Sequence, residues 1–155
     1  MSLQWPMKIE CDLTAAEVAA RLAASGLVAT GPAARDDGHG YDGWFATGAA
    51  IFVGDVLPRS RDDPVVVELG INYRILMTFI FDKWNMDRPA QWREFLDVAL
   101  HISTWPGTAG VLLSEGDDLI LMWRGDDLII NDTSDYVEAV AALAASRGRI
   151  QHVPW

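Results

Sequence analysis

Alternation of apolar with other side chains is clearest between Val65 and Phe81, where every second residue is apolar. This is the period of a β-strand that buries one face. The run is longer than an average strand, so we expect a bend or bulge at Gly70. The second half of the run is apolar on both faces, which is typical of a central strand covered by helices.

Shorter apolar runs between turn residues predict further strands. They cover residues 5–11, 49–57, 109–113, 119–123 and 128–131, and residues 150–153 suit a short edge strand. The segments 116–118 and 125–127 both read Gly-Asp-Asp between apolar runs, so we predict a hairpin turn at each. The polar segment 58–64 predicts another turn.

Three further segments have the apolar spacing of helices. The first begins at a capping box formed by Thr14 and Glu17 and ends near Gly26, which suits a left-handed cap. The second begins at residues 87–89, with a proline suited to the first turn. The third begins at residues 135–138. The predicted inward-facing residues are Val18, Leu22, Trp92, Phe95, Leu96, Ala99, Leu100, Val137, Val140, Ala141 and Ala144.

Residues 30–48 interrupt this regular pattern because they are crowded with glycine, proline and aspartate. We predict a long loop here, of the kind that is either functional or mobile in a compact domain. The complete set of elements predicts an α+β fold, with a mostly antiparallel sheet packed against about three helices. No linker rich in proline, glycine or serine divides the chain, so we expect residues 1–155 to form a single domain.

Composition indicates the cellular compartment in which the protein is expected. No apolar stretch reaches the roughly 18 residues that a membrane span needs. The N-terminus lacks the basic region and the apolar run of a secretory signal. Cys11 is the only cysteine among 155 residues, so an intrachain disulfide is impossible and a zinc site built from cysteines is excluded. We expect a cytoplasmic protein.

The formal net charge of −10 narrows the choice of partner. A nucleic-acid binder needs a basic surface that displaces counterions from phosphates, and the sequence contains none. An anionic membrane surface is disfavoured for the same reason. A basic protein partner would be attracted, and its approach accelerated. The acidity is also explained by solubility alone.

Candidate catalytic groups are few. His39 lies in the glycine-rich segment beside Asp36, Asp37 and Asp42, but their spacing matches no calcium loop. His101 adjoins the apolar stripe of the second helix, where a packed residue is commoner than a ligand, and His152 is close to the C-terminus. Cys11 at the end of a strand is typical of a small buried residue. No nucleophile-elbow, phosphate-loop or dinucleotide-binding pattern occurs.

The paired aspartates in the two predicted hairpin turns allow three interpretations. Turn chemistry explains them directly, because both pairs follow glycine between apolar runs. Four carboxylates at one sheet edge would instead hold Mg²⁺ for phosphoryl chemistry. The third reading is acidic contact with a partner. We favour turn chemistry, and we predict no catalytic residue, metal site or cofactor.

Seven tryptophans are many for this length, and most of them fall near the ends of predicted elements. Large aromatic side chains at a surface commonly anchor protein interfaces, although ordinary core and boundary packing explains any one of them. Together with the acidic loops, they favour a protein-binding surface.

The order of features resembles a known family, the immunity proteins of the Sit polymorphic-toxin systems. The similarity covers residues 65–132 well and 5–28 loosely, and 30–48 departs from it. It is carried by Leu69-Gly70-Ile71-Asn72-Tyr73, by Met77-Thr78-Phe79-Ile80-Phe81-Asp82-Lys83, by Pro106-Gly107, and by Val111-Leu112-Leu113 and Leu128-Ile129-Ile130-Asn131.

The resemblance implies a cytoplasmic protein that binds a cognate toxin and blocks its active site or its delivery, without a catalytic motif. An acidic immunity protein suits a basic toxin such as a nuclease. The residues expected at this surface are Asp36, Asp37, Tyr41, Trp44, Asp117, Asp118, Asp126 and Asp127. The alternatives are a module that self-associates through exposed aromatic side chains, and a small enzyme with a carboxylate-bound metal.

Overall fold

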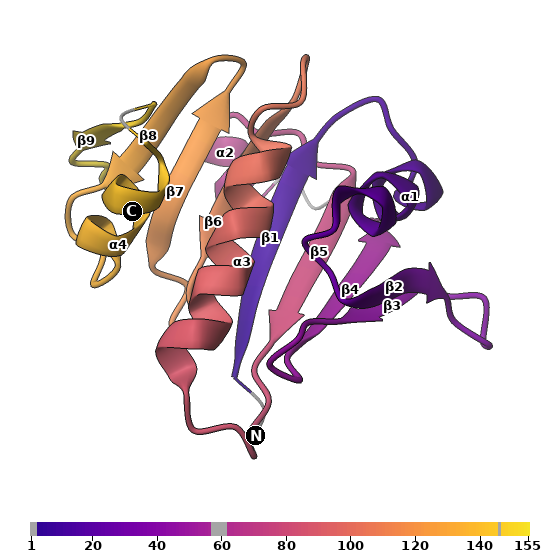
Figure 1. Cartoon of the computed structure of the whole chain (residues 1–155). Coiled ribbons are helices and arrows are strands. Elements are labelled where there is room, and N and C mark those ends of the chain that lie inside the picture. The colour runs from indigo at the N-terminus through magenta and orange to yellow at the C-terminus, as the bar shows by residue number, and fades with distance from the viewer. Residues whose placement is uncertain (1–2, 57–61, 146) are drawn as a thin grey trace.

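The computed structural model describes all residues except 1–2, 57–61 and 146. Its centre is one nine-stranded sheet with the order β2-β3-β4-β5-β1-β6-β7-β8-β9 (Figure 1). All neighbouring strands are antiparallel except β8 and β9, which are parallel. The strands are β1 (Gln4–Glu10), β2 (Thr30–Ala34), β3 (Tyr41–Trp44), β4 (Ala50–Asp55), β5 (Ile75–Ile80), β6 (Ala109–Leu113), β7 (Leu119–Arg124), β8 (Asp127–Asn131) and β9 (Arg149–Gln151).

Three helices, α1, α3 and α4, pack on one face of the sheet, and the short α2 lies on the other (Figure 1). Their bounds are α1 (Ala15–Ser25), α2 (Pro64–Val67), α3 (Arg88–Ile102) and α4 (Val137–Leu143). The predicted α+β class with a mostly antiparallel sheet is therefore confirmed. Within the described residues, no helix has the length and apolar composition that crossing a membrane requires.

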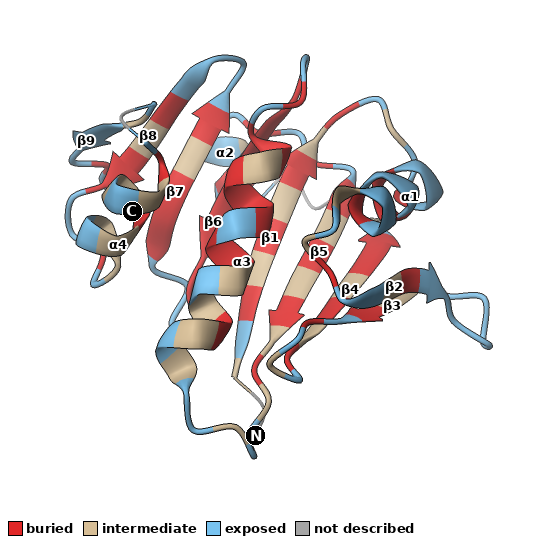
Figure 2. Cartoon of the chain, in the orientation of Figure 1, coloured by how far each residue is buried: buried red, intermediate tan, exposed pale blue. Residues whose placement is uncertain are grey.

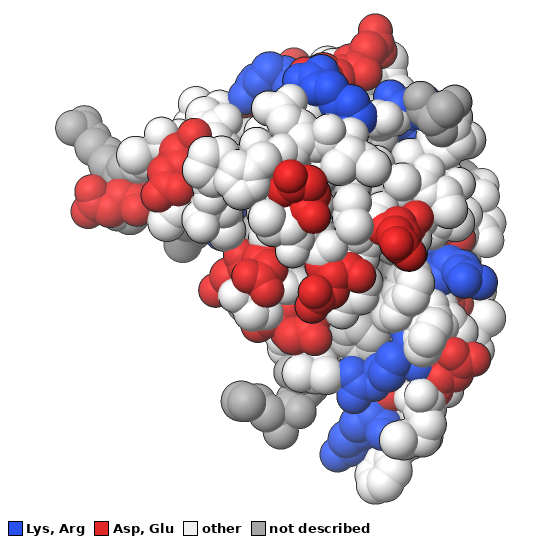
Figure 3. All heavy atoms as spheres, turned by 90° about the vertical axis from the view of Figure 1, so that its left-hand side faces the viewer, with Lys and Arg blue, Asp and Glu red and all other residues white. Residues whose placement is uncertain are grey.

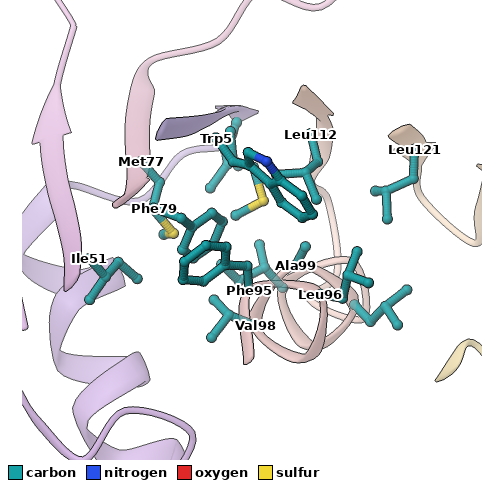
Figure 4. Packing of buried hydrophobic residues seen from close by; sticks show 14 of the residues in the cluster. Trp5, Ile51, Met77, Phe79, Phe95, Leu96, Val98, Ala99, Leu112 and Leu121 are labelled. Carbon is teal, nitrogen blue, oxygen red and sulfur yellow. The ribbon is translucent and has the colours of Figure 1, made fainter. Parts of the chain in front are cut away.

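The larger core fills the space between the sheet and α1, α3 and α4. Trp5 of β1, Phe79 of β5 and Phe95 of α3 are completely buried there (Figure 4). The Phe79 and Phe95 rings stack with their centroids 4.9 Å apart, and Trp5 meets Phe95 edge-on at 5.7 Å. Aromatic side chains of three distant segments therefore join the two strands to the long helix.

A smaller core lies on the opposite face, because successive residues of a strand point to opposite sides of the sheet. Leu112 belongs to the larger core, whereas its neighbours Val111 and Leu113 belong to the smaller one. Along β1 and β5, Figure 2 shows buried residues in red alternating with intermediate residues in tan. The smaller core is completed by Val65, Ile71, Tyr73, Leu119 and Val153.

The starts predicted for α1 and α3 and the end predicted for α1 are confirmed, whereas α3 ends at Ile102, before the Pro106-Gly107 turn that the sequence suggests as its end. The Thr14 hydroxyl accepts from the Glu17 amide at 3.2 Å, the Glu17 side chain accepts from the Thr14 amide, and Gly26 adopts the left-handed conformation. Asp87 caps α3 by accepting from the Ala90 amide at 3.1 Å. Each cap satisfies amides that the helix itself leaves unpaired.

The strand predicted from Val65 to Phe81 is wrong in its first half. Residues 64–67 form α2, because Asp63 accepts from the Val65 amide at 2.9 Å and a proline occupies the first turn. Gly70 has φ +66° in the connection after α2, so it marks a turn and not a bulge within a strand. The second half is confirmed as β5, which lies inside the sheet between β4 and β1.

The long loop predicted for residues 30–48 is also wrong, since this segment forms the β2–β3 hairpin at one edge of the sheet. Gly43 lies within β3, where a Cβ atom would come to 2.8 Å from the Thr30 carbonyl oxygen. The glycine that suggests a loop therefore allows neighbouring backbones to approach closely. Of the predicted turn at 58–64, residues 58–61 lie outside the described residues, as does Leu57 at the end of the strand predicted over residues 49–57.

Candidate partner-binding surfaces

The turn of the β2–β3 hairpin presents carboxylates that are partly neutralised within the hairpin. Asp37 accepts from the His39 amide at 2.8 Å, and the Arg35 guanidinium lies 3.1 Å from Asp37 and 3.6 Å from Asp42. The hydrogen bond from the His39 amide and the nearby Arg35 charge lower the pKa of Asp37 from its ordinary value. His39 thus contributes its backbone here.

Trp44 and Tyr41 occupy the two ends of β3. The Trp44 side chain is 49 % exposed and lines a shallow hollow together with Asp36 and Asp37. Tyr41 is half-buried, and it lines a different hollow with Phe52 of β4. The structure therefore brings Asp36, Asp37 and Trp44 together around one hollow, whereas Tyr41 lines the other. We call residues 35–44 the hairpin surface.

The two aspartate pairs are separated by the length of a strand. Asp117 and Asp118 lie in the turn before β7, whereas Asp126 lies in the turn after it and Asp127 is the first residue of β8. Six residues of extended chain span about 20 Å. The two pairs are therefore too far apart to place four carboxylates around one metal ion. Among the described residues, no three His, Cys, Asp or Glu side chains are grouped as metal ligands.

Both turns have the hairpin geometry that the sequence predicts. Arg124 pairs with Asp127 across the two-residue turn 125–126, and Gly125 has φ +58°, as the first position of a tight hairpin turn requires. In the other turn, the Ser114 amide donates to the Asp118 carbonyl at 2.9 Å. Asp127 is paired with Arg149 of β9, so its charge is engaged within the fold.

A surface that the sequence does not predict surrounds the β6–β7 turn. Asp118 lines one hollow together with Glu115, Asp135 and Tyr136. Burial raises the pKa of the Tyr136 hydroxyl, and the carboxylates of Glu115 and Asp135 raise it further. We define the acidic end of the molecule by Glu115, Asp118 and Asp135, which line this hollow or the next, with Asp117, whose carbonyl accepts from Trp155, and Asp132, which lies against His152. Figure 3 shows acidic atoms gathered over the middle of the side that carries β8, β9 and α4.

The acidic end cannot be recognised in any single segment of the sequence, because its members come from segments about twenty residues apart. The segment after β8 returns to the β6–β7 turn only because β7 lies between β6 and β8 in the sheet. Asn131 reinforces this return, since its side-chain amide donates to the Leu119 carbonyl at 3.0 Å and its oxygen accepts from the Val153 amide. The register of the sheet, and not a motif, therefore assembles the carboxylates.

The loop between β5 and α3 displays two large apolar side chains that sequence reasoning also left out of the site. Trp84 is 82 % exposed and Met86 is 86 % exposed, the highest values among the large apolar residues that the structure describes. The sequence offers their position as a signal. Both residues lie between the end of a strand and the Asp87 cap, so they belong neither to the apolar alternation of the strand nor to the apolar spacing of the helix.

The remaining candidate groups do not combine into a catalytic centre in the described part of the chain. Cys11 is buried, which raises the pKa of its thiol, and its sulfur lies 3.7 Å from the Leu13 carbonyl oxygen. His101 packs edge-on against Trp105 with 5.8 Å between the ring centroids. His152 lies 3.0 Å from Asp132 at the exposed C-terminal end. No described histidine forms a hydrogen bond with the Cys11 thiol.

The fold and its surfaces define the class of protein: it is an α+β protein with charged turns and one exposed apolar loop at the rim of its sheet. Within that class, the SitI3-like family model matches residues 4–139, so the chain belongs to the SitI3-like family. No curated protein and no solved structure matches the chain. The match includes β1 to β8 and the first turn of α4, and therefore all three surfaces described above.

Proposed function

We propose that this chain is an immunity-type protein that binds and neutralises a cognate toxin without catalysis. Membership of the SitI3-like family over residues 4–139 carries the proposal. The cytoplasm is the compartment in which such a protein would meet a toxin that enters or is made in the same cell. The partner is therefore a protein, and a basic one would be attracted by the net charge of −10.

The charge distribution supports binding more than it supports chemistry. At the hairpin surface and the acidic end, carboxylates stand on turns at the rim of the sheet, where they are accessible to another protein. Asp36, Asp117, Asp118 and Asp126 form no ion pair within the described residues. Such groups steer an oppositely charged partner and accelerate its association.

Co-expression tests the function directly. The product of the adjacent, co-transcribed gene is expressed in a sensitive host with and without this chain, and growth is followed. We expect growth arrest that is relieved only when the chain is present. A harmless product, or one that kills in both cases, would contradict the immunity function for this pair.

A second measurement tests the contribution of the acidic residues. Reversing one pair, for example Asp117→Lys with Asp118→Lys, should slow association with a basic toxin and weaken its dependence on salt. The hairpin pair Asp36 and Asp37 is reversed in a separate variant. On-rates that remain unchanged in both variants would remove the acidic residues from the interface.

A further inference from the structure

The β5–α3 loop, residues 81–87, is the most conspicuous apolar feature on the surface. Trp84 and Met86 stand two residues apart, and neither packs into the core. Single exposed apolar residues are normal on a protein surface, but two such large side chains on one short loop are not explained by the fold. The loop lies at the end of the sheet where β1 begins (Figure 1).

A buried amide holds this loop in a fixed shape. Gln91 of α3 is 0 % exposed, and its side-chain oxygen accepts from the Asp82 amide at 2.7 Å. The Gln91 side-chain nitrogen donates to the Asn85 carbonyl at 2.9 Å and to the Asp82 carbonyl at 3.3 Å. Asn85 in turn donates to the Thr47 carbonyl at 2.9 Å, which joins the loop to the β3–β4 turn. The exposure of the apolar side chains is therefore a property of an ordered loop.

The carboxylates near the loop are engaged inside the protein. Asp82 accepts from the Trp84 amide at 3.0 Å, Asp87 caps α3, and Glu94 accepts from the Thr47 hydroxyl. Each of these acids has a structural partner that fixes its position in or beside the loop.

The cations near the loop are arranged differently. Lys83, Arg88 and Arg93 form no ion pair with any described residue. They lie instead against aromatic rings: the Lys83 ammonium is 5.0 Å from the centroid of the Trp84 ring, and the Arg88 guanidinium is 4.9 Å from that of Phe81. Figure 3 shows basic atoms at the lower end of the molecule, away from the acidic middle of that side.

The geometry points to the β5–α3 loop as an anchor that docks in an apolar pocket of the partner protein, with carboxylates of the partner around that pocket. This inference rests on the proposed function, because the partner it describes is the cognate toxin. Trp84 and Met86 would fill the pocket, and Lys83 and Arg88 would meet its acidic rim. Interfaces take most of their binding energy from a few such aromatic anchors, while rim charges set the orientation and the on-rate.

A protein partner fits the surroundings of the loop better than a membrane does. Tryptophan beside lysine also suits the interface of an anionic bilayer. The chain as a whole, however, is rich in carboxylates and carries a formal net charge of −10. An anionic membrane is an extended surface, so it would face these carboxylates as well as the loop and be repelled, whereas carboxylates at the rim of one protein pocket meet the loop alone.

Variants of exposed residues test the anchor without disturbing the core. Trp84→Ala and Met86→Ala remove the apolar contacts, and Lys83→Glu with Arg88→Glu reverses the rim charge. Val67→Ala is the matched control, because Val67 is an apolar residue that is 62 % exposed on α2, on the other face of the sheet. The probe is the purified product of the adjacent gene, titrated calorimetrically and by surface binding kinetics, with growth rescue measured in parallel.

We expect Trp84→Ala to weaken the affinity about 30-fold or more and to abolish growth rescue, whereas Val67→Ala leaves both unchanged. Met86→Ala should weaken the affinity about fivefold, and the charge reversal should slow association roughly tenfold. An unchanged affinity in Trp84→Ala, with a wild-type chain that binds and protects, would overturn the anchor and leave the immunity function intact.

The other outcomes are separable from this one. A wild-type chain that neither binds nor protects contradicts the immunity function, and the anchor falls with it. Sedimentation of the chain alone that shows dimers abolished by Trp84→Ala would assign the loop to a second copy instead. Binding to phosphatidylcholine vesicles with 25 % phosphatidylglycerol that depends on Trp84 would assign it to a membrane. Either result overturns the toxin as the occupant.

Discussion

The β5–α3 loop and the hairpin surface each display a tryptophan, but they hold it in different ways. Trp44 belongs to β3, where its backbone pairs with Thr30 and Ala50, and about half of its side chain is covered. Trp84 belongs to no strand or helix, and most of its side chain is in solvent. Backbone pairing fixes the first residue, whereas hydrogen bonds from one buried side chain fix the loop that carries the second.

The two regions also differ in how their charges are used. In the hairpin, Arg35 is paired with Asp37 and Asp42, so the basic group is the one that is engaged. In the loop, Asp82 and Asp87 are engaged by amides, and Lys83 is left for external contacts. Charged groups are therefore held in different ways in the two regions, by ion pairs in the hairpin and by backbone amides in the loop.

The largest expected effect on stability comes from removing the Gln91 side-chain amide, which orders the β5–α3 loop. Gln91→Leu would remove three hydrogen bonds and leave the Asp82 amide and two loop carbonyls without their buried partner. We expect the free energy of unfolding to fall by about 3 kcal/mol. Chemical denaturation measures the loss, and hydrogen exchange should show faster exchange of the amides of residues 82–87.

Arg93→Ala serves as its control, because Arg93 is exposed on the same helix, and it should change the free energy of unfolding by less than about 0.5 kcal/mol. If Gln91→Leu were as stable as the wild type and its loop amides exchanged no faster, the loop would be ordered by something other than Gln91. The contrast with the strand-fixed hairpin would then disappear.

The next largest effect concerns the hairpin turn and uses two glycines with positive φ. At Gly40, φ is +97° and a Cβ atom would lie 2.8 Å from the Val53 carbonyl oxygen, whereas at Gly38, φ is +74° and the space is open. Gly40→Ala combines strain with a backbone clash, so we expect a loss of about 2.5 kcal/mol; Gly38→Ala should lose about 1 kcal/mol. Thermal or chemical unfolding of the two variants measures both losses, and equal losses would contradict the close packing of the hairpin on β4.

Comparison of the two regions also shows where sequence reasoning succeeds. Caps and turns are set by a few adjacent residues, so the capping box at Thr14 and the tight turn at Gly125 follow from the sequence. The strands β6, β7 and β8 follow for the same reason, because short apolar runs lie between those turns. The residues predicted for the inward face of α3 are buried except for Trp92, which is half-buried.

The errors arise where one residue type serves two purposes. Glycine and proline in residues 30–48 suggest a loop, but Gly43 lies in a strand because β2 and β4 approach its backbone closely. The alternation after Val65 suggests a strand, but the cap at Asp63 and the following proline begin a helix, and Val67 is exposed. Close packing of neighbouring strands overrides the local pattern at Gly43, and a local cap overrides the alternation at residues 64–67.

The candidate surfaces were predictable only in part, for a related reason. The turn aspartates are predictable from the sequence because turn residues are exposed, and Trp44 is predicted at the surface because its segment suggests a loop. The partnership of Asp118 with Asp135 depends on the sheet register, and the exposure of Trp84 depends on which of the seven tryptophans the core has room to cover. Trp5 and Trp84 both stand near element ends, yet the first is completely buried.

A smaller effect separates the two exposed tryptophans by stability alone. Trp44→Ala removes a side chain that is about half covered, and we expect the free energy of unfolding to fall by about 1.5 kcal/mol. Trp84→Ala should change it by less than about 0.5 kcal/mol, because little of that side chain is buried. Denaturant titration of both variants is the measurement. A loss above 1 kcal/mol in Trp84→Ala would show that this residue stabilises the fold and would weaken its assignment to an interface.

The smallest expected effect is the pH dependence contributed by Asp37 in the hairpin turn. The folded state lowers the pKa of this carboxyl from its ordinary 3.8, mainly through the His39 amide and then through Arg35. A lowered pKa means that the folded state favours the charged form, so the contribution to stability is present above pH 3.8 and is lost as the pH falls through the folded value. The difference in stability between wild type and Asp37→Asn should therefore shrink as the pH is lowered from neutral into this range.

Carboxyl titration by NMR separates the two causes of the shift. In Arg35→Gln the pKa of Asp37 should return only part of the way, because the His39 amide still donates to the carboxylate. High salt should act in the same direction as this substitution, since it screens the exposed Arg35 charge but leaves the hydrogen bond in place. A complete return to the ordinary value in Arg35→Gln would mean that the Arg35 charge alone lowers the pKa of Asp37, and that the hydrogen bond from the His39 amide contributes nothing to the shift.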